Sequence, residues 1–317
     1  MTLPISWSLL GEALWEWNED RAPRLGAALA YYMVFALAPS LILIIALAGL
    51  ILGREAAEGQ IVAEVQDLVG RQAAEAIQAT IDNAGRRGGL IATGFGFVSL
   101  LFGLWGVFGE LQDALNTIWG VTSKPGRGVL GTLKQRFWSF TMVVGIGFLL
   151  LVTLAVSAWL AALGTFFTEL LPSPAYLVET INALFSFVVI TCLFAMIYKF
   201  LPDVSVSWRD VWLGAGVTSF LFTLGKTLIG LYLGRSTAAS AYGAAGSLII
   251  ILIWIYYSAQ ILFFGAELTK VCSRKAGRRP VPQEMAVPMT AEARAAQGMD
   301  RTEHRDSRRS QERLRRL

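Results

Sequence analysis

The chain has 317 residues, of which 55% are hydrophobic and 16% are charged, and its mean hydropathy is +0.54. Soluble domains contain about 25% charged residues, so this composition excludes an ordinary soluble protein and indicates a membrane protein. The net charge of +4 comes from residues 276–317, which hold ten arginines and six acids, because the rest of the chain is neutral.

The first predicted element is an amphipathic helix within residues 1–20. Its apolar face consists of Trp7, Leu10, Leu14 and Trp17. Three tryptophans in this short segment favour a helix at the membrane interface over a solvated leader helix. No cleavable signal peptide is expected, because acidic residues precede the first long apolar run and no basic region opens the chain.

Six apolar segments then follow, each suited to cross a bilayer core of about 30 Å as a helix. The predicted spans are about 26–52, 90–108, 138–163, 180–200, 211–233 and 244–266. Between the first two lies an amphipathic helical segment, 55–83, which is too charged to cross. The predicted fold class is all-α: a polytopic membrane protein with six transmembrane helices in one bundle, residues 21–272, plus amphipathic helices at the N-terminus and in the first outer loop.

The distribution of Lys and Arg near the span ends predicts the orientation. One set of ends carries 13 such residues and the opposite set carries five, which places both termini in the cytoplasm. Residues 273–317 are predicted to be a basic, disordered cytoplasmic tail, since they contain no sustained apolar face. Residues 280–317 are therefore expected to be dispensable for folding.

The candidate site consists of polar or helix-distorting residues in or beside the spans: Tyr31, Tyr32, Pro39, Glu110, Asp113, Asn116, Lys226, Tyr242 and Glu267. Pro39 removes a helical hydrogen bond and predicts a kink in the first span. Tyr31 and Tyr32 are adjacent, so they point about 100° apart and at least one should face the bundle interior. The alternatives are a packed kink with an interfacial tyrosine and a hydroxyl-lined cavity wall.

Charged groups near the membrane offer the same choice between structural and functional roles. Lys226 either extends its ammonium outward to water or faces a cavity, where an intramembrane charge indicates function. Glu110, Asp113 and Asn116 share a helical face. We expect them to meet Glu267 and close the cytoplasmic side of a cavity. The alternative is that these carboxylates pair with basic residues, namely Lys199, Arg209 or Lys270.

Catalytic signatures are absent from the sequence. The only histidine is His304, and Cys192 and Cys272 have neither disulfide-framework nor metal-site spacing. No zinc-protease, nucleophile-elbow or phosphate-loop motif occurs. We therefore expect no enzymatic activity, no metal and no cofactor.

Four segments carry a family resemblance: RLGAALAYYMVFALAPSLI, ELQDALNTIWGV, YKFLPDVSVSWRDVWLGAGVTSFLF and YGAAGSLIIILIWIYYSAQILFFGAEL. In this order they resemble the YihY/BrkB family of bacterial inner-membrane proteins. The resemblance implies a six-span bundle in the cytoplasmic membrane, and links to virulence and envelope lipid export have been proposed for members. An older family label, ribonuclease BN, is disfavoured by the lack of a hydrolytic metal site, so no nucleic-acid partner is expected.

The resemblance also points to particular positions in this chain. They are Tyr31, Pro39, Asn116, Trp119, Pro202, Trp208, Gly214, Tyr242, Gly243, Trp254, Tyr256, Gly265 and Glu267.

These observations lead to a functional prediction with one alternative. The prediction is transport of a lipid, another amphiphile or a small solute linked to the cell envelope, and the alternative is a non-transporting membrane scaffold. Membrane lipids are the expected partners, and assembly into a homo-oligomer is left open. A cavity lined by Tyr31, Lys226 and Glu110 would favour transport, whereas a bundle filled by Leu, Ile and Phe would favour the scaffold.

Overall fold

The computed structural model describes residues 7–36, 90–124, 175–235, 246–278, 280–283 and 286–299. These residues are mainly helical. The helices are α1 (Trp7–Glu19), α5 (Leu90–Trp119), α7 (Ala175–Phe200), α8 (Trp208–Arg235), α10 (Gly246–Lys275) and α11 (Ala291–Ala296), and residues 22–36 are also helical. The strands are β1 (Val121–Ser123), β2 (Val204–Ser205), β3 (Val281–Pro282) and β4 (Ala286–Pro288).

Among the residues that the structure describes, three helices are long and apolar enough to cross a membrane, judged by length and composition. Their apolar windows are Ala183–Phe200, Trp208–Ile229 and Ile249–Lys275. These windows overlap the predicted spans 180–200, 211–233 and 244–266, although the third window extends nine residues beyond the predicted end. The first two predicted spans are described in part, by helical residues 22–36 and by α5. The predicted span 138–163 and the predicted helix 55–83 lie outside the described residues, so the count of six remains a prediction.

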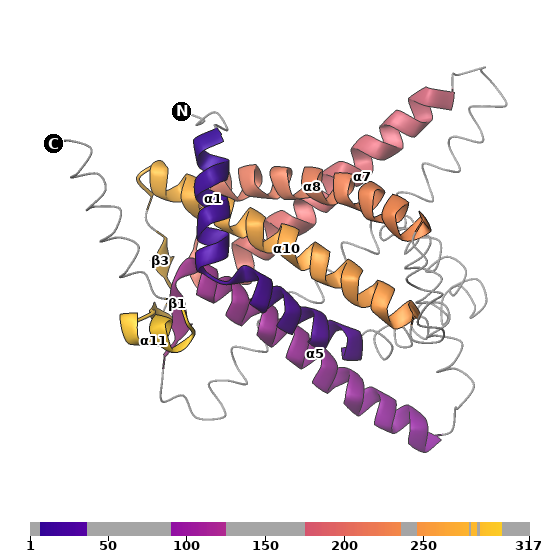
Figure 1. Cartoon of the computed structure of the whole chain (residues 1–317), viewed down its shortest axis with the longest axis horizontal. Helices are drawn as coiled ribbons and strands as arrows, with labels where there is room; N and C mark the ends of the chain where they lie inside the picture. The colour runs from indigo at the N-terminus through magenta and orange to yellow at the C-terminus, as the bar shows by residue number, and fades with distance from the viewer. Residues whose placement is uncertain are drawn as a thin grey trace.

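The central helix is α10, which contacts α8, α5 and α1, while α7 packs on α8 (Figure 1). Small residues bring α8 and α10 close together, as is usual for membrane helices. A Cβ on Gly265 would collide with the hydroxyls of Thr218 and Tyr198. The Tyr198 hydroxyl donates to the Leu262 carbonyl at 2.8 Å and lies 2.9 Å from Thr218 Oγ1. Tyr198 and Phe263 are fully buried, so this junction belongs to a tightly packed core.

One end of the bundle carries a cap, which we define as α1, the four strands and α11. Figure 1 shows α1 lying across the C-terminal end of α10. Strand β1 follows α5 and pairs antiparallel with β4, while β2 lies between α7 and α8 and pairs antiparallel with β3. The C-terminal segment therefore joins two loops that are far apart in the sequence.

The prediction of a disordered tail is wrong for residues 280–283 and 286–299. Besides forming β3, β4 and α11, this segment buries Met299 to 2% exposure and donates the Met289 N–H to the Gly120 carbonyl at 2.9 Å. The physical reason is backbone pairing, which needs no apolar periodicity. Two- and three-residue strands are too short to show an alternating pattern. Residues 300–317 lie outside the described residues.

Only part of the apolar face predicted for α1 is buried in the structure. Leu10 and Trp17 pack against the protein, but Trp7 and Leu14 are exposed. The buried side of the helix instead carries Leu9, Ala13 and the carboxylate of Glu16. This arrangement follows from ion pairing with α10, which turns the acidic stripe of α1 inward.

Candidate functional site

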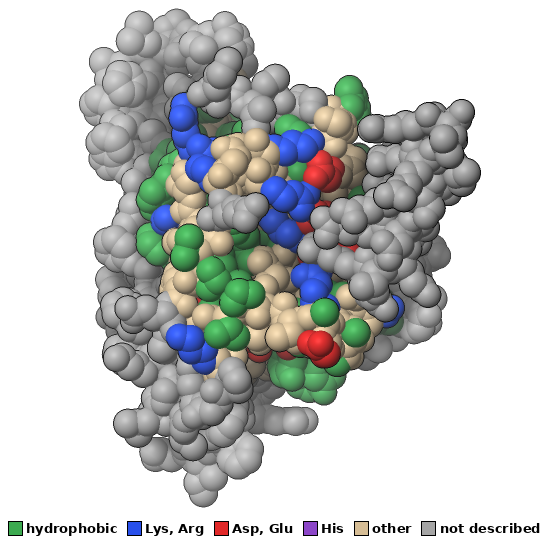
Figure 2. Space-filling model, turned by 90° about the vertical axis from the view of Figure 1, so that its left-hand side faces the viewer, with side chains coloured by type: hydrophobic (Ala, Val, Ile, Leu, Met, Phe, Trp, Pro, Cys, Tyr) green, Lys and Arg blue, Asp and Glu red, His purple; other side chains and the backbone are tan. Residues whose placement is uncertain are grey.

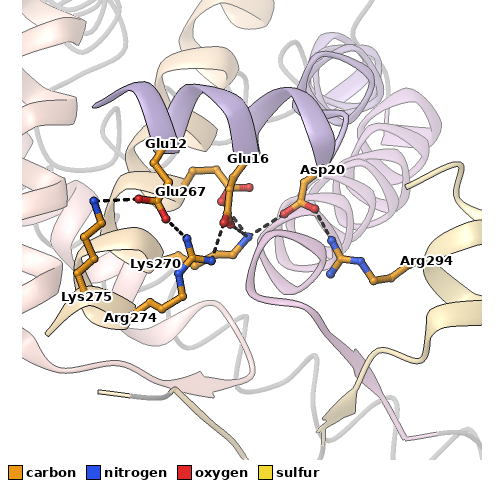
Figure 3. A network of polar contacts seen from close by, with 8 residues as sticks. All are labelled: Glu12, Glu16, Asp20, Glu267, Lys270, Arg274, Lys275 and Arg294. Atoms are coloured by element: carbon orange, nitrogen blue, oxygen red, sulfur yellow. Dashed lines mark hydrogen bonds and ion pairs between the residues drawn. The ribbon is translucent and has the colours of Figure 1, made fainter. Parts of the chain in front are cut away.

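The candidate site is a network of charged side chains in the cap, which we call the ionic network (Figure 3). Its members are Glu12, Glu16, Asp20, Glu267, Lys270, Arg274, Lys275 and Arg294. Three of the acids, Glu12, Glu16 and Asp20, recur every four residues, so they lie on one side of α1 and of the residue that follows it. Figure 3 shows these carboxylates pointing toward the basic side chains of α10.

Lys270 lies at the centre of the network. Its Nζ is 2.8 Å from a Glu16 oxygen, 2.8 Å from an Asp20 oxygen and 2.9 Å from a Glu267 oxygen. The side chains of Asp20 and Glu267 are fully buried, and those of Glu16 and Lys270 are 3% and 11% exposed. Burial of charge on this scale is tolerated only where the partners are close and numerous.

The carboxylates of Glu16, Asp20 and Glu267 offer oxygens within 4.8 Å of one another, a spacing that could hold a metal ion. Here the Lys270 ammonium contacts all three carboxylates. It therefore supplies the positive charge that a metal would supply. The chemistry of this donor set fits an internal ion pair better than a divalent cation, because an adjacent ammonium repels one.

Three further bases surround this centre. Arg274 Nη1 lies 2.5 Å from Glu16 and Arg294 Nη2 lies 2.5 Å from Asp20. Arg274 also pairs with Glu12, and Lys275 Nζ lies 2.9 Å from the other oxygen of Glu12. Four acids thus meet four bases, so the network is neutral. It joins α1, α10 and α11.

The network changes the acidity of the α1 carboxyls. Burial by itself raises the pKa of the Glu16 carboxyl, but the neighbouring Lys270 and Arg274 outweigh burial and hold the pKa below its usual range. At Glu12, burial also raises the pKa, while hydrogen bonds and charge from Lys275 and Arg274 lower it further than burial raises it. Both carboxyls are therefore held in the ionised form.

A second polar cluster joins α5 to the α7–α8 loop. The Asp203 carboxylate accepts from Gln112 Nε2 at 3.1 Å and from Asn116 Nδ2 at 2.9 Å. The Asp203 N–H donates to Asn116 Oδ1 at 2.7 Å, and its carbonyl accepts from the Gln283 N–H at 2.9 Å. Asn116 and Asp203 are both buried. This cluster therefore fixes the end of α5 against the loop and the C-terminal segment.

The predicted polar residues are divided between these clusters. Asn116 binds Asp203, whereas Glu267 binds Lys270, one of the three basic partners considered from the sequence. Glu110 is half-buried and Asp113 is exposed. The structure thus gives Asn116 and Glu267 different partners. Their meeting with Glu110 and Asp113 to close a cavity stays a prediction.

The tyrosines of the first span face outward in the described part of the chain. Tyr31 is 59% exposed and Tyr32 is 41% exposed, although the Tyr32 ring packs against Gly106 of α5. Lys226 is half-buried on α8. Pro39 and Tyr242 lie outside the described residues. A role for these residues in lining a cavity remains a prediction.

Sequence reasoning missed most of the ionic network. Glu16, Asp20 and Arg294 were not among the candidate residues, and neither was Asp203. One signal was available for the α1 acids. Carboxylates that recur every four residues on a helix predicted to lie at the membrane need basic partners to be buried. No comparable signal marks Arg294, because its neighbours in the sequence, AEARAAQ, show no pattern that points to a partner as distant as Asp20.

The comparisons with known proteins give the family. Residues 13–289 match the family model described as "Virulence factor BrkB". The chain belongs to this family. The matched region includes β3 and β4, so the strands of the C-terminal segment lie within the part of the chain that the family model matches.

Relatives of this BrkB-family chain are named as membrane proteins. It is 29% identical over 276 residues to a UPF0761 membrane protein of Pseudomonas paraeruginosa, covering 84% of this chain and 64% of that protein. It is 30% identical over 276 residues to one of Azotobacter vinelandii, covering 83% and 63%. A match to one of Ralstonia nicotianae is 31% identical over 160 residues and covers 50% and 34%. The chain thus spans less than two thirds of these relatives. No solved structure matches.

Proposed function

We propose that this BrkB-family chain is a membrane transport protein without enzymatic activity. Its substrate is a lipid, another amphiphile or a small solute connected with the cell envelope. In this proposal the protein lies in the bacterial inner membrane, and the cap lies on the cytoplasmic side together with both termini. The excess of Lys and Arg at the predicted cytoplasmic span ends supports this orientation.

The observation that carries the proposal is the position of Gln260 on α10. Its amide lies against Gly26, and both its Nε2 and its Oε1 are buried without a hydrogen-bond partner among the described residues. Gln260 lies inside the apolar window Ile249–Lys275. A buried polar group without a partner needs a physical reason. Gln260 packs directly against Gly26 in this structure, so a substrate reaches the amide only when α10 and residues 22–36 move apart. Contact with the polar part of such a substrate is the reason that we propose.

The ionic network supports closure of such a path at one end. It joins α1, α10 and α11 through side chains that are largely withdrawn from water. Since the network is neutral, its groups can be buried together without a net charge. A substrate that entered beside Gln260 would therefore meet a closed cap at that end.

Transport can be tested in vesicles that contain the purified full chain and a trace of phosphatidylethanolamine with a fluorescent headgroup. Dithionite quenches the label in the outer leaflet only, so loss of the protected half reports movement across the bilayer. We expect the native chain to move the label and Gln260→Leu to reduce the rate at least tenfold with an unchanged melting temperature. Thr227→Val, which removes an exposed hydroxyl of α8, should move the label like the native chain.

A non-transporting scaffold is the alternative, and one observation favours it. Figure 2 shows Lys and Arg side chains gathered over the left-hand side of Figure 1, where the cap lies. The side chains of three bases are partly exposed, at 47% for Arg274, 35% for Lys275 and 41% for Arg278, whereas the carboxylates that pair with Lys270 are buried. Each of these bases also pairs with a carboxylate, but their exposed parts remain accessible to an acidic partner. Vesicles that protect the label as well as protein-free vesicles do would reject lipid transport and favour this scaffold.

A further inference from the structure

We propose that the corner between α7 and α8 binds the headgroup of an anionic phospholipid. The α7–α8 corner is defined by Lys199, Phe200, Trp208, Arg209 and Trp212. The proposal requires only that the chain lies in a membrane. It is therefore independent of transport, and either proposal can fail without the other.

The corner lies at the depth where two candidate spans end. The apolar window of α7 ends at Phe200 and that of α8 begins at Trp208. The residues between them include β2, which pairs with the C-terminal strand β3. Where a span ends, the hydrocarbon core gives way to the phosphate layer. Side chains at this corner therefore lie at the level of lipid headgroups.

Three aromatic rings of the corner are exposed although they are large and apolar. Phe200, Trp208 and Trp212 are 52%, 45% and 47% exposed. The rings of Phe200 and Trp208 lie 5.8 Å apart between centroids with an edge-to-face geometry, which holds both in place. Trp208 and Trp212 are one helical turn apart, so they share a face of α8. Indole rings of this kind prefer the boundary between acyl chains and headgroups.

Two cations accompany these rings. Lys199 Nζ lies 5.5 Å from the centroid of the Trp208 ring and donates a hydrogen bond to the Val206 carbonyl, so the ammonium is held in position. Arg209 is exposed and follows Trp208 directly. An ammonium has three donors and a guanidinium five, and both suit the oxygens of a phosphodiester.

The carboxylates near the corner are already engaged. Asp210 lies next to Arg209, but its two oxygens accept from Arg278, one of them from Nε at 3.0 Å and the other from Nη2 at 2.5 Å. The bases of the ionic network likewise bind carboxylates. In the described part of the chain, Lys199 and Arg209 have no such partner, so their charges are complementary to an external anion.

The combination of rings and cations favours a lipid over a soluble phosphate. A soluble phosphate would contact only the two cations, whereas a lipid also covers the apolar surface of Phe200, Trp208 and Trp212. Burial of apolar surface adds free energy in proportion to its area. We therefore commit to a phospholipid with a net negative headgroup, such as phosphatidylglycerol.

The test measures lipid binding to the full chain in detergent by native mass spectrometry, with phosphatidylglycerol and phosphatidylcholine as the two probes. We expect the native chain to bind phosphatidylglycerol more tightly. Arg209→Gln should weaken this binding about fivefold, the effect of one basic residue near an anionic surface, and leave the melting temperature unchanged. Trp212→Leu should weaken it as well, through the lost ring contact.

Lys275→Gln is the matched control, because it also removes one positive charge from the same end of the molecule but acts on a base that binds Glu12. It should leave phosphatidylglycerol binding unchanged. Equal binding of the two lipids would overturn the proposal. An equal loss of phosphatidylglycerol binding in Arg209→Gln and Lys275→Gln would overturn it as well. Full competition by glycerol 3-phosphate would also overturn it, since a soluble anion would then account for the site.

Discussion

Replacement of Lys270 by methionine should strongly destabilise the protein. The change keeps an unbranched side chain as far as Cε and removes the ammonium that lies 2.8 Å from Glu16, 2.8 Å from Asp20 and 2.9 Å from Glu267. Loss of one partner from a buried ion pair costs about 3–5 kcal/mol. Because three carboxylates lose the same partner, we expect a loss in the upper part of that range.

The assay is the free energy of unfolding of the purified chain in mixed micelles, titrated with sodium dodecyl sulfate and followed by tryptophan fluorescence. Lys275→Met is the matched control, since Lys275 and its partner Glu12 have side chains 35% and 32% exposed. Exposed pairs contribute at most about 1 kcal/mol. A second variant, Lys270→Met with Glu267→Gln, should recover part of the loss because it removes one of the three stranded charges.

The reasoning would be refuted if Lys270→Met cost no more than Lys275→Met. In that case water reaches the centre of the network, or the carboxylates take up protons without a free-energy penalty. Failure of Glu267→Gln to recover any stability would separately show that Glu267 is not one of the groups left without a partner.

Three further predictions concern the cap and the core. A chain ended after Arg278 should unfold at a clearly lower temperature than one ended after Met299, since only the longer chain forms β3, β4 and α11; equal melting temperatures would show that the C-terminal segment adds no stability. Gly265→Ala should cost about 1–3 kcal/mol in unfolding free energy through overpacking, whereas Gly216→Ala, with nothing within 4 Å of the added Cβ, should be neutral or slightly stabilising in the same titration. The folded pKa of Glu16 lies below its ordinary value of 4.5. Its contribution to stability is therefore complete above that pH and is lost as the pH falls through the folded pKa. A pH titration of the unfolding free energy should show a smaller loss of stability at acid pH in Glu16→Gln than in the native chain.

Three of the predicted spans correspond to helices found in the structure because hydropathy is a local property. Residues 180–200, 211–233 and 244–266 are each apolar enough to cross a bilayer, and in a bilayer the backbone must satisfy its own hydrogen bonds. The resemblance to the BrkB family was confirmed for the same reason, since its motifs are contiguous stretches of sequence. One side-chain contact was also within reach, the pair of Glu267 with Lys270, which lie one helical turn apart.

The cap, by contrast, was decided by tertiary structure. Arg294 and Asp20 are separated by 274 positions, and Asn116 and Asp203 by 87. No periodicity within a helix reports contacts over such distances. Residues 281–282 and 286–288 pair with two loops through backbone groups, which every residue except proline carries in the same form. Local composition determined which segments are helical and apolar, whereas the burial of α1's acids and the order of the C-terminal segment depend on partners that only the folded chain brings together.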